Sequence, residues 1–131
     1  MMRGAVTDPA PVRGMTTETK RPGTHHFIAL ELAFQIVRSL RKVVEVTRRY
    51  DGELAKQIVA SASSIASNLA EGNRRVGKDR VHFFRIAAGS ADEMQTHLRI
   101  ALAWGWVSTK DIDQTLDLVD QELAILYRLT H

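Results

Sequence analysis

The stretch ASSIASNLAEGNRRVGKD, residues 62–79, joins two helical patterns through a short basic turn. On its N-terminal side, apolar residues recur at helical spacing through the run ASASSIAS, residues 60–67. Because nearly all side chains of that run are small, a second helix can approach closely. We therefore predict a central helix over residues 53–71, with Gly72 as its C-terminal glycine.

The turn itself invites comparison with a phosphate-binding loop. Gly72, Gly77 and Lys78 have the spacing of the G-x-x-x-x-G-K-[ST] motif, but Asp79 stands where the motif needs a magnesium-binding hydroxyl. The residues before the turn are helical, whereas a phosphate loop follows a strand. The stretch therefore predicts an interhelix loop, with Lys78 and Asp79 at the start of the next helix, where an acid suits the helix dipole.

Three further helical patterns cover residues 27–49, 78–104 and about 108–129. Their ends carry recognisable signals: an N-cap at Asp51, a terminating glycine at Gly105, and a capping box from Ser108 to Asp111. With short connections, these helices predict an all-α, antiparallel up-down-up-down four-helix bundle over residues 26–131.

Several of these helices carry two apolar stripes rather than one. A bundle helix in a monomer needs a single buried stripe, so the second one predicts contact between subunits of a homo-oligomer. The alternative is a wide seam inside a monomer.

Composition narrows the class of protein. The chain has 131 residues, 44% of them hydrophobic and 25% charged, as expected for one globular domain. The absence of cysteine excludes disulfides, zinc–thiolate sites and cysteine nucleophiles, and fits a cytoplasmic protein. No apolar run is long enough to span a membrane. Residues 1–25 hold all the prolines and predict a disordered tail, in which Met15 is a possible start alternative to Met1.

Positive charge is concentrated in the middle of the chain. Residues 38–85 carry 11 Lys and Arg against 5 Asp and Glu, whereas residues 86–131 carry 3 against 7. This asymmetry suits an anionic partner or self-complementary subunits. The sequence leaves open whether the cations form one patch or two, or simply a solvated loop. The candidate nucleic-acid-binding residues are first Arg74, Arg75, Lys78 and Arg80, then Arg41, Lys42, Arg48 and Arg49.

Three motifs in order give a resemblance to a known family. SIASNLAEG (64–72) matches S-[IV]-x-x-N-[IL]-A-E-G, FFRIAAGSADEMQTHL (83–98) matches F-x-x-x-A-x-G-S-x-x-E-x-x-x-x-L, and GWVS (105–108) matches G-[YW]-[LVI]-[ST]. The chain resembles the four-helix bundle family of 23S rRNA intervening-sequence proteins over roughly residues 27–130. The motif positions are Asn68, Glu71, Gly72, Gly89, Glu93 and Gly105.

The resemblance implies a small bacterial cytosolic bundle that forms a ring-like homo-oligomer, often a pentamer. It extends to the accessory variability determinant of diversity-generating retroelements, a pentameric basic barrel that binds nucleic acid and a reverse transcriptase. One departure is FIALELAFQIV, residues 27–37, which keeps only the rough spacing of the family's usual Y-x-x-L-x-V-[WY] pattern.

The sequence contains no pattern of residues that predicts a catalytic or metal-binding site. Glu93 and His97 are four apart without a second copy, so they do not form a di-metal motif. Asn68 and Glu71 are expected to fix the turn by hydrogen bonding, with a polar site inside the oligomer as the alternative. Trp104 and Trp106 are expected to anchor the core or a subunit contact, with base stacking as the alternative.

The sequence thus predicts a non-enzymatic protein without cofactor or metal. We expect it to bind structured RNA or another nucleic acid; the alternative is a protein-interaction scaffold or accessory subunit that makes no contact with nucleic acid.

Overall fold

The computed structural model describes residues 24–131, with side chains from residue 28 onward. The predicted tail, apart from residues 24 and 25, lies outside this part. The described chain is all-helical and contains no strand. Its five helices are α2 (Thr24–Ser39), α3 (Arg41–Tyr50), α4 (Gly52–Asn73), α5 (Gly77–Ala103) and α6 (Thr109–Thr130).

The first predicted helix, residues 27–49, is wrong as a single element. It is divided at Leu40, whose amide bonds to the Val37 carbonyl at 3.1 Å, one residue closer than in an α-helix. The Ser39 hydroxyl donates to the Ile36 carbonyl at 2.7 Å and bonds to the Thr115 hydroxyl of α6 at 2.7 Å. A serine that bonds back to its own helix disturbs the helix locally, which accounts for the break.

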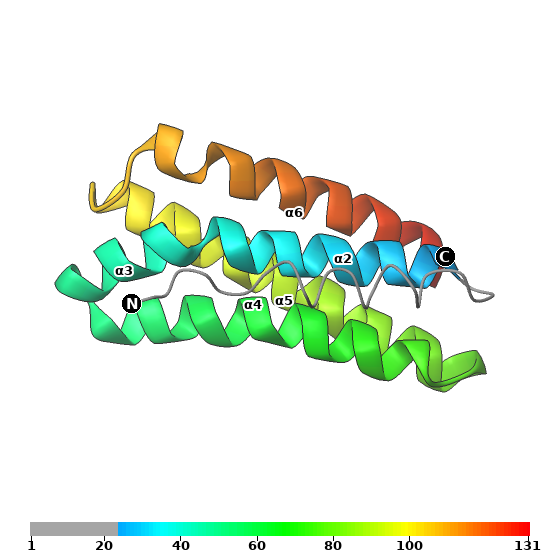
Figure 1. Cartoon of the computed structure of the whole chain (residues 1–131). Coiled ribbons are helices and arrows are strands. Elements are labelled where there is room, and N and C mark those ends of the chain that lie inside the picture. The colour runs from blue at the N-terminus through cyan, green and yellow to red at the C-terminus, as the bar shows by residue number, and fades with distance from the viewer. Residues whose placement is uncertain (1–23) are drawn as a thin grey trace, which may run out of the picture.

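The helices lie side by side along one direction (Figure 1). α2 and α3 follow one another along the molecule, and α4, α5 and α6 then alternate in direction. α4 packs against α2, α3 and α5, while α6 packs against α5 and α2. The α3 segment and the α5–α6 turn lie at one end of the molecule, and the α4–α5 loop and the C-terminus lie at the other.

The core follows the predicted apolar stripes of α4 and α5. The residues predicted for the centre of the two stripes are buried: Leu54, Ile58, Ile65 and Leu69 in α4, and Phe84, Ala87, Ala91, Met94, Leu98 and Ala101 in α5. Of the residues predicted to widen the α5 stripe, Ile86, Ile100 and Trp104 are exposed. Among the small residues of α4, Ser64 faces α5, because its hydroxyl bonds to that of Ser90 at 2.7 Å, whereas Ala62 and Ser63 lie on the side of α2 and α3. The prediction of a close helix neighbour for this segment is confirmed.

The predicted helix caps also form. The Asp51 carboxylate accepts from the amides of Glu53 and Leu54 at 3.0 and 3.1 Å. Ser108 and Asp111 complete the capping box of α6. At the end of α5, Gly105 adopts a φ of 81°, and its amide and that of Trp106 bond to the carbonyls of Leu102 and Ala101. This is the hydrogen-bond pattern of a Schellman motif, which stops the helix.

Gly72 has a different role from the one predicted. It lies inside α4, which continues to Asn73, and it is buried rather than terminating the helix. A Cβ atom at this position would lie 2.6 and 2.8 Å from two ring carbons of Phe84, and 3.2 Å from the Cβ of Phe83. The missing side chain therefore makes room for the first turns of α5.

We expect Gly72→Ala to lower the free energy of unfolding by about 1–3 kcal/mol, because Phe84 is held in the core and has little room to move. Urea denaturation followed by circular dichroism measures this. Gly89→Ala is the matched control, since Gly89 is exposed within α5 and nothing lies within 4 Å of its Cβ position. The control should gain up to about 1 kcal/mol from helix propensity. Equal stability of the two variants would contradict the packing argument.

Candidate nucleic-acid interface

The two predicted groups of cations lie at opposite ends of the molecule. Arg41, Lys42, Arg48 and Arg49 belong to α3, whereas the loop cations follow α4, which spans 22 residues or about 33 Å. At the loop end, Arg85 bonds to the Thr130 carbonyl at the end of α6. The question left open by the sequence is thereby answered: these residues do not form one patch.

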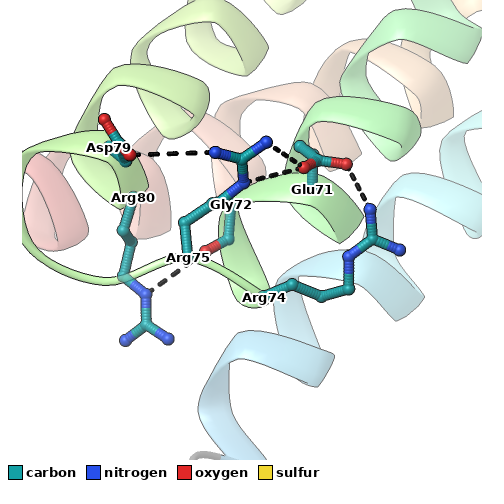
Figure 2. A network of polar contacts seen from close by, with 6 residues as sticks. All are labelled: Glu71, Gly72, Arg74, Arg75, Asp79 and Arg80. Carbon is teal, nitrogen blue, oxygen red and sulfur yellow. Dashed lines mark hydrogen bonds and ion pairs between the residues drawn. The ribbon is translucent and has the colours of Figure 1, made fainter.

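The Glu71 carboxylate interacts with both Arg74 and Arg75, two of the four cations that the sequence analysis ranked first (Figure 2). Arg74 forms an ion pair with Glu71, and the Arg75 guanidinium donates to the same carboxylate at 2.8 Å. The hydrogen bond from Arg75, with the charges of both arginines, lowers the pKa of Glu71. Arg75 also lies 3.7 Å from the Asp79 carboxylate. Glu71 therefore fixes the turn through its arginines, and two of the four cations around this turn, Arg74 and Arg75, have a local counter-charge.

The other two cations of this group, Lys78 and Arg80, make different contacts. Arg80 donates to the carbonyls of Gly72 and Asn73 at 3.3 and 3.2 Å, in the last turn of α4, where carbonyls lack a partner within the helix; the Gly72 carbonyl also accepts from the Arg75 amide at 3.0 Å. Lys78 is exposed and forms no ion pair with any described residue. Of the four loop cations, Lys78 is the one whose charge has no partner in this part of the chain.

The α3 group is arranged differently. All four of its cations are exposed, and none forms an ion pair within residues 28–131. α3 contains one acid, Glu45, so the helix carries a formal charge of about +3 (from its sequence RKVVEVTRRY). Lys42 lies near enough to the start of α6 to contribute to the lowered pKa of Asp111, whose main cause is the hydrogen bond from the Ser108 amide. The α3 cations are therefore the less compensated of the two groups.

Three aromatic rings stack beside the end of α3. The Tyr50 and Trp106 ring centroids lie 5.6 Å apart at an interplanar angle of 4°, and those of Trp106 and Trp104 lie 5.7 Å apart at 10°. Trp106 is partly buried against the core, whereas Trp104 is 68% exposed and Tyr50 is 61% exposed. The expectation of core anchoring fits Trp106 but not Trp104, which is mostly exposed, and the contact between subunits that was also expected stays a prediction.

The remaining motif residues have structural contacts. The Asn68 amide donates to the carbonyl and hydroxyl of Ser64, both at 2.9 Å, and so fixes the hydroxyl that reaches α5. Glu93 and His97 face each other at 3.4 Å along α5. Within the described residues, no three side chains of the metal-binding types come together.

One buried acid was missed by the sequence analysis. Glu122 of α6 is fully buried, and neither of its carboxylate oxygens has a hydrogen-bond partner. Burial raises its pKa to about 8 from an ordinary value of 4.5. It shares the buried face of α6 with Leu118, Val119 and Leu126, at helical spacing. An acid in the middle of an apolar stripe was the available signal.

We expect the stability of the protein to depend on the protonation of Glu122. The folded state binds this proton more tightly than the unfolded chain, so its contribution is complete below about pH 4.5 and is lost as pH rises towards 8. The difference in unfolding free energy between wild type and Glu122→Gln should therefore vary with pH over this range. Urea titrations of both proteins measure it, with the exposed Glu53→Gln as control; a difference independent of pH would contradict burial of an unpaired carboxyl group.

An apolar groove lies where the first two helices meet α4. It has a volume of about 250 Å³ and includes the partly exposed Val37 and Val59 on its rim. Its lining residues are Val37, Leu40, Arg41, Val44, Val59, Ala62 and Ser63.

These features define an all-helical protein with cations at both ends and, among the described residues, no group of side chains that could hold a metal ion. Residues 26–128 match the family described as 23S rRNA-intervening sequence protein, and the chain belongs to that family. No curated protein matches it.

A crystal structure of a protein of unknown function from Bacteroides thetaiotaomicron, assigned to the S23 ribosomal protein family, is similar in fold. Its TM-score is 0.65 at 18% identity, and the alignment covers 80% of this chain and 96% of the other. None of the described helices is long and apolar enough to cross a membrane.

Proposed function

We propose that this protein is a non-enzymatic, cytoplasmic RNA-binding protein that acts as a homo-oligomer. In this proposal α2 and α3 together form the first member of an antiparallel up-down-up-down four-helix bundle. The observation that carries the RNA-binding proposal is the group of four exposed α3 cations without ion pairs in the described chain. Phosphate groups supply the missing counter-charge, and repetition of α3 around an oligomer multiplies the field.

The ion pairs change which of the two cation groups we expect to bind phosphate more strongly: the α3 cations now rank above those around the α4–α5 turn. Arg74 and Arg75 must break their ion pairs with the Glu71 carboxylate before they bind a phosphate, so their phosphate contacts contribute less to the free energy of RNA binding. Arg48 and Arg49 in the last turn of α3 have no such competitor. We therefore assign the main phosphate contacts to α3, and a smaller share to Lys78 at the start of α5.

RNA binding should weaken steeply as salt rises, because phosphate contacts release counterions. We expect Arg48→Ala/Arg49→Ala to reduce the slope of log affinity against log salt by about 1 for each phosphate that the variant no longer neutralises. Arg74→Ala/Arg75→Ala removes the same charge from the other end and is the matched control, with a smaller reduction. Fluorescence anisotropy of a labelled structured RNA over a salt series provides the measurement.

The outcomes separate the alternatives. Equal slopes for the two double variants would contradict the assignment to α3 and favour a general electrostatic field. No binding by wild type at low salt would contradict the RNA proposal. The α3 cations would then serve the alternative role, a protein-interaction scaffold in which they meet an acidic surface such as Asp113, Asp117 and Asp120 of a neighbouring α6.

The oligomeric part of the proposal is supported by the apolar groove. Val59 is 42% exposed and Val37 is 37% exposed, and both border the 250 Å³ groove. An apolar surface of this kind is stabilised when a second subunit covers it. The family resemblance favours five subunits.

We expect a light-scattering mass near five times the 14.7 kDa of the chain. Val59→Glu should shift the mass towards a single chain, because it places a charge in the apolar contact. Gln57→Glu adds the same charge at an exposed position of α4 that does not line the groove, and should leave the mass unchanged. Dissociation of both variants alike, or of neither, would contradict a contact at the groove.

A further inference from the structure

We propose that Tyr50, Trp106 and Trp104 form a stacking platform for unpaired RNA bases. This inference rests on the proposed RNA-binding function and specifies its ligand: RNA with a single-stranded segment, a loop or a bulge, rather than a continuous duplex. Bases within a duplex are already stacked and paired, so the exposed rings have access only to bases that lie outside one.

The geometry of the rings is suited to this ligand. The two successive interplanar angles of 4° and 10° make the three rings nearly parallel, as bases are in a stacked strand. The central ring, Trp106, is packed against the core and holds the platform in place. The two outer rings, Tyr50 and Trp104, are mostly exposed, so each end of the stack can receive a further aromatic plane.

The charges around the platform favour a phosphate-linked ligand. Arg48 and Arg49 immediately precede Tyr50 in α3, and the exposed Lys110 lies in the first turn of α6, close to Trp106 in sequence. Proteins that bind single strands combine such cations with aromatic rings on which bases stack.

Three of the acids at this end, Asp51, Asp111 and Glu53, have their own partners. The carboxylates of Asp51 and Asp111 accept hydrogen bonds at the starts of α4 and α6. Glu53 lies 3.9 Å from the Lys56 ammonium group. These acids leave the arginines of the last turn of α3 unpaired within the described chain, which favours a strand carrying phosphates over an apolar protein surface.

The two tryptophans of the chain are both in this platform, so its intrinsic fluorescence reports on it directly. The probes are an unstructured oligouridine and a blunt RNA duplex with the same number of phosphates, both at low salt. We expect oligouridine to quench the tryptophan fluorescence and the duplex to leave it nearly unchanged. Trp104→Ala should weaken oligouridine binding about tenfold and duplex binding less than about twofold.

Tyr127→Ala is the matched control. Tyr127 is 63% exposed and stacks on His131 at the far end of α6, so its loss should change neither affinity. Circular dichroism of each variant checks that the helices are intact.

The two proposals fail in different ways. If Trp104→Ala binds oligouridine as tightly as wild type, with salt dependence retained, the platform inference is overturned and the RNA-binding proposal stands. If Trp104→Ala changes the oligomeric mass and not the RNA affinity, the rings form a contact between subunits, which also overturns the inference. If wild type binds neither RNA, the proposed function fails and the inference with it.

Discussion

The close contact of α4 with α5 is the constraint on which the rest of the structure depends. Small side chains bring the two helices together along their middle, where the Ser64 and Ser90 hydroxyls bond. Towards the loop, the missing side chain of Gly72 admits the Phe84 ring. The short loop between these two packed helices brings Arg74 and Arg75 back against Glu71 in the last turn of α4.

Much of the helical framework could be predicted from the sequence, because periodicity and capping are local properties. The buried stripes of α4 and α5 and the caps at Asp51 and Ser108 are confirmed. The break at Leu40 could not be predicted, because the Ser39 hydroxyl that accompanies it also contacts Thr115, which is 76 residues away. The role of Gly72 was hidden for the same reason, since an internal packing glycine and a terminal glycine look alike in sequence.

In the candidate site too, contacts between residues that are distant in the sequence could not be predicted. The sequence left open whether the cations form one patch or two, and the structure places the two groups at opposite ends. Which cations have counter-charges could not be judged from composition, because Glu71 and Asp79 pair selectively with the loop. The parallel rings of Tyr50, Trp106 and Trp104 arise where two helix ends meet, and no motif marks that meeting. Together these arrangements give the two ends of the molecule different chemistry despite similar numbers of basic residues.

The buried carboxyl group of Glu122 makes the proton a ligand of the folded state. At neutral pH the unfolded chain carries this group ionised, while the folded chain carries it protonated, so folding takes up close to one proton at this site. A species that binds only the native state stabilises it by mass action. The heat of folding near neutral pH consequently contains the ionisation enthalpy of whichever buffer releases that proton, and the concentration of hydrogen ions becomes part of the folding equilibrium of this protein.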